Sequence, residues 1–532
     1  MQKTVPWWTS GVLYQVYPRS FQDSDGDGVG DLSGIIRRLP YLRELGVDAV
    51  WLSPIFASPM EDFGYDISDY IGIDPLFGAL GDFDALVAAV HGHGLKLILD
   101  LVPNHTSEQH PWFVESRSSR DNPKRDWFIW RDGAGDGGPP TNWLSEFGGS
   151  AWHFDELSGQ YYYHAFLRQQ PDLNWRNPDV RQAIAEVMRF WLKRGVDGFR
   201  VDVMWHLIKD DQFRDNPPNP DYAAERQPYE RLLPLYSTDR PEVHAVVAEL
   251  RQVMDAFDDR VLIGEIYLPP ERLVAYYGEN LAGAHLPFNF ALISTPWSAA
   301  AIAKLIAAYE AALPPGAWPN WVLGNHDRMR IASRVGADQA RLAAMLLLTL
   351  RGTPTLYYGD EIGLPQIPIA PEQVRDPFEK NVPGFGIGRD GCRTPMQWDG
   401  SSHSGFSSAE PWLPLSDNFR NENVASQSED MASILNLYRT LIALRRARPE
   451  LSIGDYNPMA VVGNVLVFQR AHNGSRLIIA LNFGTVAVAL AAETVGLNGQ
   501  IVLSTVTDRS SGGVAGQLEL RGGEGIILEP VA

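Results

Sequence analysis

The stretch Gly198-Phe-Arg-Val-Asp202 is a short apolar run that ends in a carboxylate, and two distant fragments have the same form. These fragments are Ile263-Gly-Glu265 and Asn325-His-Asp327. Carboxylates at the ends of three expected strands predict one site assembled from several loops, because a barrel of parallel strands brings such ends onto one face. Two of these carboxylates could break a glycosidic bond, one as the nucleophile and the other as the acid/base.

Apolar runs alternate with helix-like patterns along the chain, which is typical of consecutive βαβ units. One such pattern places Ile184, Val187 and Trp191 on one helical face, with Pro178 where a helix would begin. The runs number eight, as a (β/α)8 (TIM) barrel needs, so the predicted fold class is α/β with this barrel. The expected strands are Val12–Val16, Ala49–Leu52, Leu95–Leu101, Gly198–Val201, Val261–Gly264, Trp321–Leu323 and Thr355–Tyr358, with His285–Phe290 as a weaker candidate.

Two regions depart from a minimal barrel. Residues 104–176 are rich in Gly, Pro and aromatic side chains, and a structureless loop of that length is improbable in a compact fold. They predict a small domain inserted after the third strand. Beyond Pro449 the pattern becomes all-β, with a strong hairpin signal at Asn473-Gly474. The predicted organisation is a catalytic barrel (1–103 and 177–449), an inserted domain (104–176) and a C-terminal antiparallel β-domain (450–532).

The composition disfavours several kinds of partner. The formal net charge of the 532 residues is −20 and no long basic run occurs, so neither nucleic acid nor an anionic membrane surface is expected to bind. The first residues lack the apolar core of a signal peptide, and no apolar run is long enough to span a bilayer. A single cysteine, Cys392, allows no internal disulfide. We therefore expect a cytoplasmic monomer or homodimer without an organic cofactor.

The first two carboxylates differ in their expected pKa. Arg200 and Asp202 are two residues apart on a strand and so point to the same side. A nearby guanidinium lowers a carboxyl pKa, which would keep Asp202 ionised as a nucleophile requires. Glu265 follows an apolar run, and partial desolvation raises the pKa of a Glu, which suits a general acid. Any one of the three carboxylates alone would more often be a helix cap or a loop ion pair, but the set of three favours an active site.

Four short motifs follow one another along the chain: Asp100-Leu-Val-Pro-Asn-His105, Gly198-Phe-Arg-Val-Asp202, Gly264-Glu265 and Asn325-His-Asp327. They resemble the four ordered motifs of the α-amylase family, glycoside hydrolase family 13. Gln170-Pro-Asp-Leu-Asn174 resembles the fifth motif of its oligo-1,6-glucosidase and α-glucosidase branch. The resemblance extends from about Gly11 to Trp398 and includes the β-domain.

The resemblance assigns roles to these residues. It implies that Asp202 is the nucleophile, Glu265 the acid/base, and Asp327 the residue that grips the 2- and 3-hydroxyls of the sugar and distorts its ring. The same sugar subsite would be lined by His105, Arg200 and His326. The two histidines could otherwise be core residues or metal ligands, but hydrogen bonds to sugar hydroxyls are the favoured interpretation.

Glu61-Asp-Phe-Gly-Tyr65-Asp-Ile-Ser resembles a further element of the exo-acting branch, in which an Asp pairs with an Arg from the loop after the last barrel strand and closes the pocket. The Asp would be Asp62, with Tyr65 beside it. The expected Arg is Arg393, and Arg389 is the less favoured candidate; an ordinary surface ion pair is the alternative. Two aromatic residues of the insert, Phe147 and Phe166, are also expected to contact substrate.

The stretch Asp23-Ser-Asp25-Gly-Asp27-Gly-Val29-Gly-Asp31 alternates carboxylates with glycines, a spacing that suits Ca²⁺ or Mg²⁺. It imitates the start of an EF-hand loop, but Gly34 stands at the twelfth position, where a Glu should be, and a strand precedes it. The family resemblance implies a structural metal instead, held by Asp23, Asp25, Asp27, Asp31 and the Val29 carbonyl. A solvated acidic turn is the alternative.

The function implied by the resemblance is that of a retaining exo-acting α-glucosidase. Such an enzyme removes terminal glucose from short α-glucosides through a β-linked glucosyl-enzyme, and it can pass glucose to hydroxyl acceptors. Val203 fits an association with α-1,6 cleavage, whereas the Pro-rich stretch Asn216–Pro228 departs from that pattern and favours α-1,4 substrates such as maltose. An oligo-1,6-glucosidase and a dedicated glucosyltransferase such as a trehalose synthase remain alternatives. The intact carboxylates argue against an inactive transporter subunit or sugar-binding module.

Overall fold

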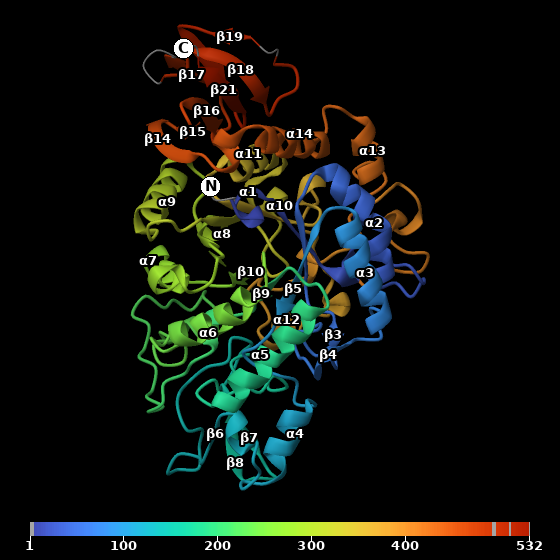
Figure 1. Ribbon diagram of the computed structural model, residues 1–532, viewed down its shortest axis with the longest axis vertical. Coiled ribbons are helices and arrows are strands. Elements are labelled where there is room, and N and C mark those ends of the chain that lie inside the picture. The colour runs from blue at the N-terminus through green and yellow to red at the C-terminus, as the bar shows by residue number, and fades with distance from the viewer. Residues whose placement is uncertain (1–4, 492–495, 510–511, 531–532) are drawn as a thin grey trace.

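The computed structural model describes residues 5–491, 496–509 and 512–530, and an eight-stranded parallel sheet lies at its centre. The strand order is β11-β10-β9-β5-β2-β1-β13-β12, and a parallel bridge between Asn289 and Trp321 joins the two edges. The sheet is therefore closed, and the predicted (β/α)8 barrel is confirmed (Figure 1). Its strands are β1 (Leu13–Val16), β2 (Ala49–Leu52), β5 (Lys96–Leu101), β9 (Gly198–Val201), β10 (Val261–Gly264), β11 (Leu286–Pro287), β12 (Asn320–Val322) and β13 (Thr353–Tyr357).

The barrel strands are buried on both faces, as parallel strands between a core and a layer of helices must be. Alternate residues along them, including Leu13, Trp51, Ile98 and Ile263, form a separate apolar cluster. The other residues belong to the larger core shared with the helices. The sequence expresses this arrangement as short, nearly continuous apolar runs.

Helices cover the outside of the barrel. In α5 (Pro178–Lys193) the side chain of Asn177 accepts the N–H of Asp179 and Pro178 occupies the first turn, so the helix begins where the sequence predicts. Its buried face includes Ile184 and Trp191. The other long helices are α2 (Leu32–Leu45), α3 (Leu80–Gly92), α6 (Val243–Asp255), α9 (Ala299–Ala312), α11 (Ala337–Thr349) and α14 (Ile434–Ala447).

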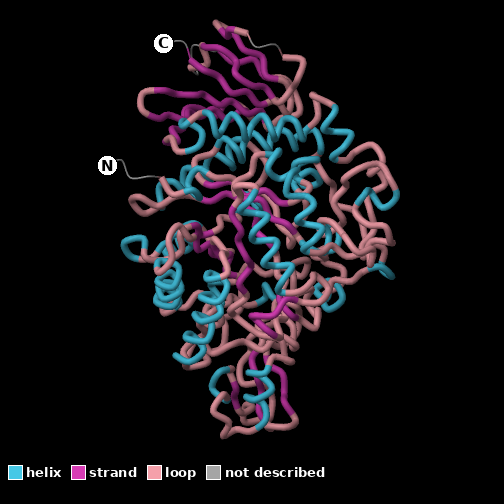
Figure 2. Tube along the Cα trace, turned by 45° about the vertical axis from the view of Figure 1, so that its right-hand side comes forward, coloured by secondary structure: helices cyan, strands magenta, loops and turns pink. Residues whose placement is uncertain are grey.

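Two smaller units lie at opposite ends of the molecule (Figure 1, Figure 2). Between β5 and α5 the chain forms α4 (Pro111–Ser118) and the antiparallel strands β6 (Trp130–Arg131), β7 (Trp152–Asp155) and β8 (Gln160–Tyr163). Trp143 and Trp175 are fully buried here, so these two rings serve as core.

The C-terminal unit is the predicted antiparallel β-domain. Its main sheet has the order β14-β15-β16-β21-β18-β19, and Asn473-Gly474 forms the β15–β16 turn with positive φ at both residues, as a tight hairpin requires. No helix among the described residues is both long and apolar enough to cross a membrane. The strands are β14 (Asp455–Val462), β15 (Val465–His472), β16 (Ser475–Asn482), β17 (Val488–Ala491), β18 (Gly499–Ser504), β19 (Gly513–Val514), β20 (Gln517–Leu520) and β21 (Gly525–Pro530).

Candidate active site

The three carboxylates Asp202, Glu265 and Asp327 lie beyond the carboxyl ends of β9, β10 and β12 and line one cavity of about 450 Å³. The barrel ladder positions the first two, because the N–H of Asp202 donates to Leu101 O at 2.8 Å and that of Glu265 to Val201 O at 2.9 Å. The structure thus brings together side chains that are far apart in sequence. They lie at the face where barrel enzymes build their active sites.

Arg200 is fully buried beneath these carboxylates and is shared among three acids. Its Nη1 lies 2.7 Å from Asp100 Oδ1 and 2.8 Å from Asp202 Oδ1, and its Nη2 lies 2.8 Å from Glu265 Oε2. The guanidinium also packs 5.0 Å from the centre of the Trp51 ring. One rigid cation therefore sets the spacing of the expected nucleophile and acid/base.

The pKa values of Asp202 and Glu265 depend on each other. Burial raises the pKa of Asp202 well above its usual range and the charge of Glu265 adds to this effect, while Arg200 opposes it. Burial also raises the pKa of Glu265, again against Arg200. The expectation that Arg200 keeps the Asp202 pKa low is wrong, because one shared guanidinium does not outweigh burial and a second carboxylate. The two carboxyls titrate as a pair, and their repulsion favours the state that holds one proton.

The backbone of Val203 is hydrogen-bonded to Glu265. Val203 has φ 37° and ψ 48°, a left-handed conformation that is rare for a β-branched residue. In this conformation its N–H donates to Glu265 Oε2 at 2.9 Å. Strain of this kind persists where the surroundings enforce it, here between Asp202 and a buried short helix, η3 (Met204–His206).

Both predicted histidines are held by hydrogen bonds. His326 Nε2 lies 2.7 Å from Tyr65 Oη and its Nδ1 lies 2.8 Å from Gln15 Nε2. The rings of Tyr65 and His326 stack with centres 5.3 Å apart. His105 Nε2 lies 3.0 Å from Tyr65 O, and burial lowers the His105 pKa to about 4. Tyr65 and both histidines line the cavity, so neutral imidazoles face the space that a sugar would fill.

The predicted partner of Asp62 is wrong. Arg389, the less favoured candidate, places Nη2 2.7 Å from Asp62 Oδ1 and lines the cavity. Arg393 is fully buried outside the lining, with Nε donating to His326 O at 2.7 Å and Nη2 2.9 Å from Asp327 Oδ1. The two arginines flank one short helical turn, η9 (Asp390–Cys392), and only packing decides which of them reaches the cavity.

Asp327 is held ionised by this arrangement. Burial alone would raise its pKa, but the neighbouring cations bring it well below the usual range. His326 Nε2 lies 3.2 Å from Asp327 Oδ2, but burial keeps the His326 pKa well below 6.5, so the ring is neutral and the charges that act on Asp327 are those of Arg389 and Arg393. The Asp327 carboxylate therefore presents an ionised hydrogen-bond acceptor to the cavity.

Asp376 is a residue that the sequence did not single out. It is fully buried, its Oδ1 lies 2.7 Å from Arg389 Nη2, and its Oδ2 accepts the backbone N–H of Arg389 at 2.7 Å. It thus fixes the arginine that faces Asp62. The segment that carries it lacks periodicity, so no pattern in one sequence could have found it.

The remaining lining comes from the insert and from the long segment after β9. Phe147 and Phe166 both face the cavity, and the Phe147 ring packs 5.1 Å from the Arg389 guanidinium. Glu146 Oε1 lies 3.0 Å from His206 Nε2, and Glu146 and Tyr229 line the same cavity. The insert and the long segment are thus joined at the cavity wall. That segment contributes Gln227, Tyr229, Glu230, Pro234 and Thr238 to the lining.

The acidic loop Asp23–Asp31 lies apart from the cavity lining. Carboxylate oxygens of Asp23, Asp25 and Asp27 all lie within 4.8 Å of one another, which suits a single hard cation. The Asp31 carboxylate accepts the N–H groups of Ser24 and Gly34 and caps α2, so it shapes the loop. These donors and spacings fit a bound Ca²⁺ or Mg²⁺.

Comparisons with known proteins agree with this geometry. A family model described as "Alpha amylase, catalytic domain" matches residues 15–454. The chain is 45% identical over 497 residues to a "Probable alpha-glucosidase" of Rhizobium meliloti (strain 1021), covering 90% of this chain and 89% of the relative. It is 38% identical to an "Oligo-1,6-glucosidase" of Parageobacillus thermoglucosidasius, covering 90% of each.

Solved structures give the same result. An alpha-glucosyl transfer enzyme superposes with a TM-score of 0.93 at 41% identity, covering 99% of this chain and 100% of that one. The trehalulose synthase from Pseudomonas mesoacidophila MX-45 superposes with a TM-score of 0.90 at 34% identity and the same coverage. With the barrel, its ordered motifs and the Arg200-linked carboxylates, these likenesses show that the chain belongs to the α-amylase family of glycoside hydrolases, family 13, in its α-glucosidase and oligo-1,6-glucosidase branch.

Proposed function

We propose that this protein is a retaining, exo-acting α-glucosidase that releases terminal glucose from short α-glucosides, with α-1,4 links such as that of maltose favoured. The observation that carries the proposal is the contact of one guanidinium, that of Arg200, with both Asp202 and Glu265. Carboxyls on neighbouring nitrogens of one guanidinium suit the separation of about 5–5.5 Å used by retaining enzymes better than the wider spacing of inverting ones.

The reaction follows from the proton that the pair shares. With that proton on Glu265, the acid donates it to the glycosidic oxygen while the Asp202 carboxylate attacks the anomeric carbon, giving a β-linked glucosyl-enzyme. Glu265, now ionised, takes a proton from water, and the resulting attack releases α-glucose and restores both carboxyls. A sugar hydroxyl in place of water would give transfer.

Exo-action is supported by the charged residues at the end of the cavity that lies opposite the reacting bond. Asp62 and Arg389 are both buried and paired, and Arg389 Nη1 also lies 3.3 Å from Asp327 Oδ1. These groups offer charged donors and acceptors to the hydroxyls of one terminal glucose. A wall of this kind leaves no room for a chain that continues past that glucose.

The preference between α-1,4 and α-1,6 links depends on the part of the cavity that holds the group bonded to the terminal glucose. The segment after β9 contacts the insert where Glu146 Oε1 lies 3.0 Å from His206 Nε2. This contact, together with the lining by Tyr229, supports a narrow space beyond the first glucose, which favours a short substrate. The second candidate is cleavage of α-1,6 links, or transfer, favoured by Val203 and by the likeness of the chain to an oligo-1,6-glucosidase and to an alpha-glucosyl transfer enzyme.

We also propose a structural divalent cation at the acidic loop, with Asp23, Asp25, Asp27, Asp31 and the Val29 carbonyl as ligands and Ca²⁺ or Mg²⁺ as the ion. The close carboxylates of the first three residues support it. The ion would neutralise their repulsion and hold the loop after β1, and it takes no part in bond cleavage.

The test is product analysis by NMR during hydrolysis of maltose, isomaltose, sucrose and trehalose. Maltose is expected to be the best substrate. On sucrose, whose leaving group is fructose and not a second glucose, α-glucose should be the first glucose anomer seen, and β-glucose first would contradict retention. A starch with dye-linked internal bonds gives the control for exo-action, since rapid dye release requires an open cleft. Asp202→Asn, prepared in parallel, identifies any contaminating glucosidase.

A further inference from the structure

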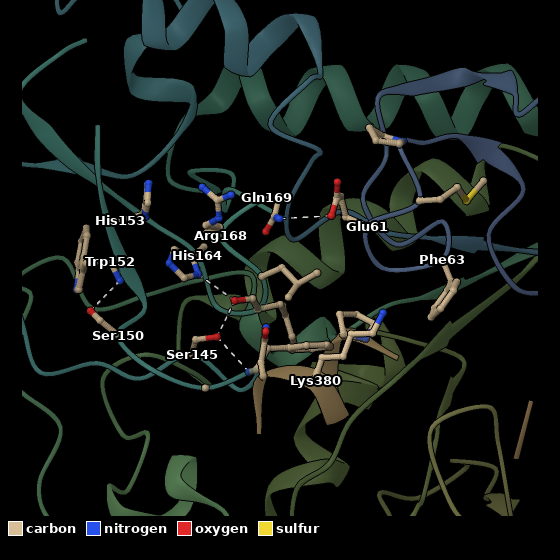
Figure 3. A pocket seen from close by; sticks show the side chains of 18 of the residues that line it. Glu61, Phe63, Ser145, Ser150, Trp152, His153, His164, Arg168, Gln169 and Lys380 are labelled. Carbon is tan, nitrogen blue, oxygen red and sulfur yellow. Dashed lines mark hydrogen bonds between the residues drawn. The ribbon is translucent and has the colours of Figure 1, made fainter. Parts of the chain in front are cut away.

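A second cavity has a volume of about 690 Å³, and Figure 3 shows side chains that line it, among them Glu61, His164 and Lys380. It shares Phe147 and Phe166 with the lining of the catalytic cavity. Three segments build it: residues 59–63 between β3 (Phe56–Ala57) and β4 (Asp69–Ile73), residues 145–169 of the insert, and residues 375–381 after β13. None of the residues that act on the glycosidic bond lines it. Its size suits a ligand comparable to a sugar derivative.

The lining of this side cavity carries an excess of positive charge, whereas the net charge of the whole protein is negative. Arg168, Arg375 and Lys380 line it, against Glu61 as the sole carboxylate of its lining, in a chain of net charge −20. None of these three side chains forms an ion pair with a described residue. Asp376, next to Arg375, is turned away toward Arg389. Cations left unpaired around one concavity attract an anion.

The side cavity also presents a hydroxyl acceptor. His164 is buried, and its Nδ1 lies 2.9 Å from Phe166 O, so Nδ1 carries the proton and donates. Burial lowers the His164 pKa to about 4, which leaves Nε2 unprotonated at neutral pH. No described residue hydrogen-bonds this nitrogen, and the residue lines the cavity. A bare imidazole nitrogen accepts from a ligand O–H.

Apolar surface completes the lining. Trp152 is only 4% exposed, and its ring packs against Trp143, Tyr163 and Phe213, so it is part of the wall. Phe63 and Met60 are half-buried and add an apolar edge to the lining. The cations together with the hydroxyl acceptor therefore specify more than a simple anion.

We propose that the side cavity is a binding site for the phosphate monoester of a sugar. The phosphate, which carries a charge of about −1.5 to −2 near neutral pH, is held by Arg375 and Lys380, which come from one segment, and Arg168 adds to the positive charge of the lining. A sugar hydroxyl donates to His164 Nε2. The site is separate from the glucose cavity, and the inference does not depend on the proposed glucosidase activity.

The test measures binding directly by titration calorimetry on the full chain, with D-glucose 6-phosphate as the probe. The titration is repeated with 1-deoxynojirimycin, a glucose mimic intended to fill the catalytic cavity. One equivalent of the phosphate ester should bind in both titrations. Inorganic phosphate and D-glucose, as the two halves of the probe, should each bind at least about tenfold more weakly.

Charge-reversal variants locate the site. Arg375→Glu combined with Lys380→Glu should weaken binding by about tenfold or more, since two attractive contacts become repulsive. The matched control, Lys304→Glu with Arg476→Glu, changes the net charge equally at exposed positions elsewhere and should bind normally. Glu61→Gln removes the opposing carboxylate and should tighten binding. Unchanged melting temperatures without ligand show that the variants fold.

Three results would overturn the proposal. They are no saturable heat at millimolar probe, equal weakening in the two double variants, and loss of binding when 1-deoxynojirimycin is present. Inorganic phosphate that binds as tightly as the ester would show a plain anion site and remove the sugar from the inference.

Discussion

Arg389→Lys is the most informative substitution at the closed end of the catalytic cavity. The guanidinium of Arg389 contacts three acids at once: Nη2 lies 2.7 Å from both Asp62 and Asp376, and Nη1 lies 3.3 Å from Asp327. A lysine keeps the charge but has one compact ammonium, so it cannot reproduce this planar fork. At least one buried acid must lose its partner.

The size of the effect follows from those contacts. A hydrogen bond to a charged group contributes about 1.5–3 kcal/mol, and every 1.4 kcal/mol is a factor of ten. If the contacts at Asp62 and Asp327 that face the glucose act at the transition state, losing one lowers kcat/KM by roughly 10- to 150-fold. The free energy of unfolding should fall by a similar amount, because a buried carboxylate is left unpaired.

The assay is kcat/KM on p-nitrophenyl α-glucoside together with a urea unfolding curve. Arg445→Lys is the matched control, because Arg445 is also buried but bonds backbone carbonyls far from the cavity lining. It should lose stability without a comparable loss of kcat/KM. If Arg389→Lys stays within threefold of the wild type in kcat/KM, the assignment of this pair to glucose recognition fails.

Three further outcomes are expected. Asp202→Asn should fold and lose several orders of magnitude in kcat, as removal of a nucleophile requires, and near-normal turnover in a clean preparation would contradict that role. In a pH–rate profile, kcat/KM should fall as pH rises through the pKa at which the Asp202–Glu265 pair gives up its last proton; burial and mutual repulsion raise that pKa, so an alkaline limb at the ordinary Glu value of about 4.3 would refute the coupling. Chelation with EDTA should lower the melting temperature before it lowers the initial rate, with recovery on adding Ca²⁺ or Mg²⁺, because an ion at 100 times its Kd stabilises the native state by about 2.7 kcal/mol. An Asp25→Asn variant should shift less with EDTA, and no shift in the wild type counts against the metal.

The sequence predicts those parts of the site that depend on regular structure. Asp202 and Glu265 continue the hydrogen-bond ladders of β9 and β10, so the apolar runs in the sequence predict that both residues lie at the carboxyl ends of neighbouring strands. The choice between Arg389 and Arg393 could not be predicted in this way. Both flank one turn in a segment without periodicity, and their orientation depends on Asp376, Phe147 and the barrel floor together.

The raised pKa values of the Asp202–Glu265 pair could not be predicted from residues close in sequence either. Two residues on one strand suggested that Arg200 serves Asp202, but the folded barrel delivers Asp100 and Glu265 to the same guanidinium. The pKa of a buried carboxyl depends on all of its charged neighbours, and those of Asp202 lie on or directly follow three strands, β5, β9 and β10. The weakest expected strand, His285–Phe290, likewise proved to be only Leu286–Pro287 plus a single bridge at Asn289, because closure of the barrel needs little more.

The buried pairing of Asp62 with Arg389 makes one end of the catalytic cavity blind. In a blind cavity, whatever enters first leaves last. In the proposed reaction, the glucose unit passes inward before its leaving group, and that leaving group stands between the glucose and the solvent until it departs. Water or an acceptor sugar would then approach the proposed glucosyl-enzyme only through the space just vacated. Because the cavity has a single opening, the leaving group departs first and free glucose departs last. The departing glucose and the next substrate molecule therefore use the same opening, and only one of them can occupy it at a time.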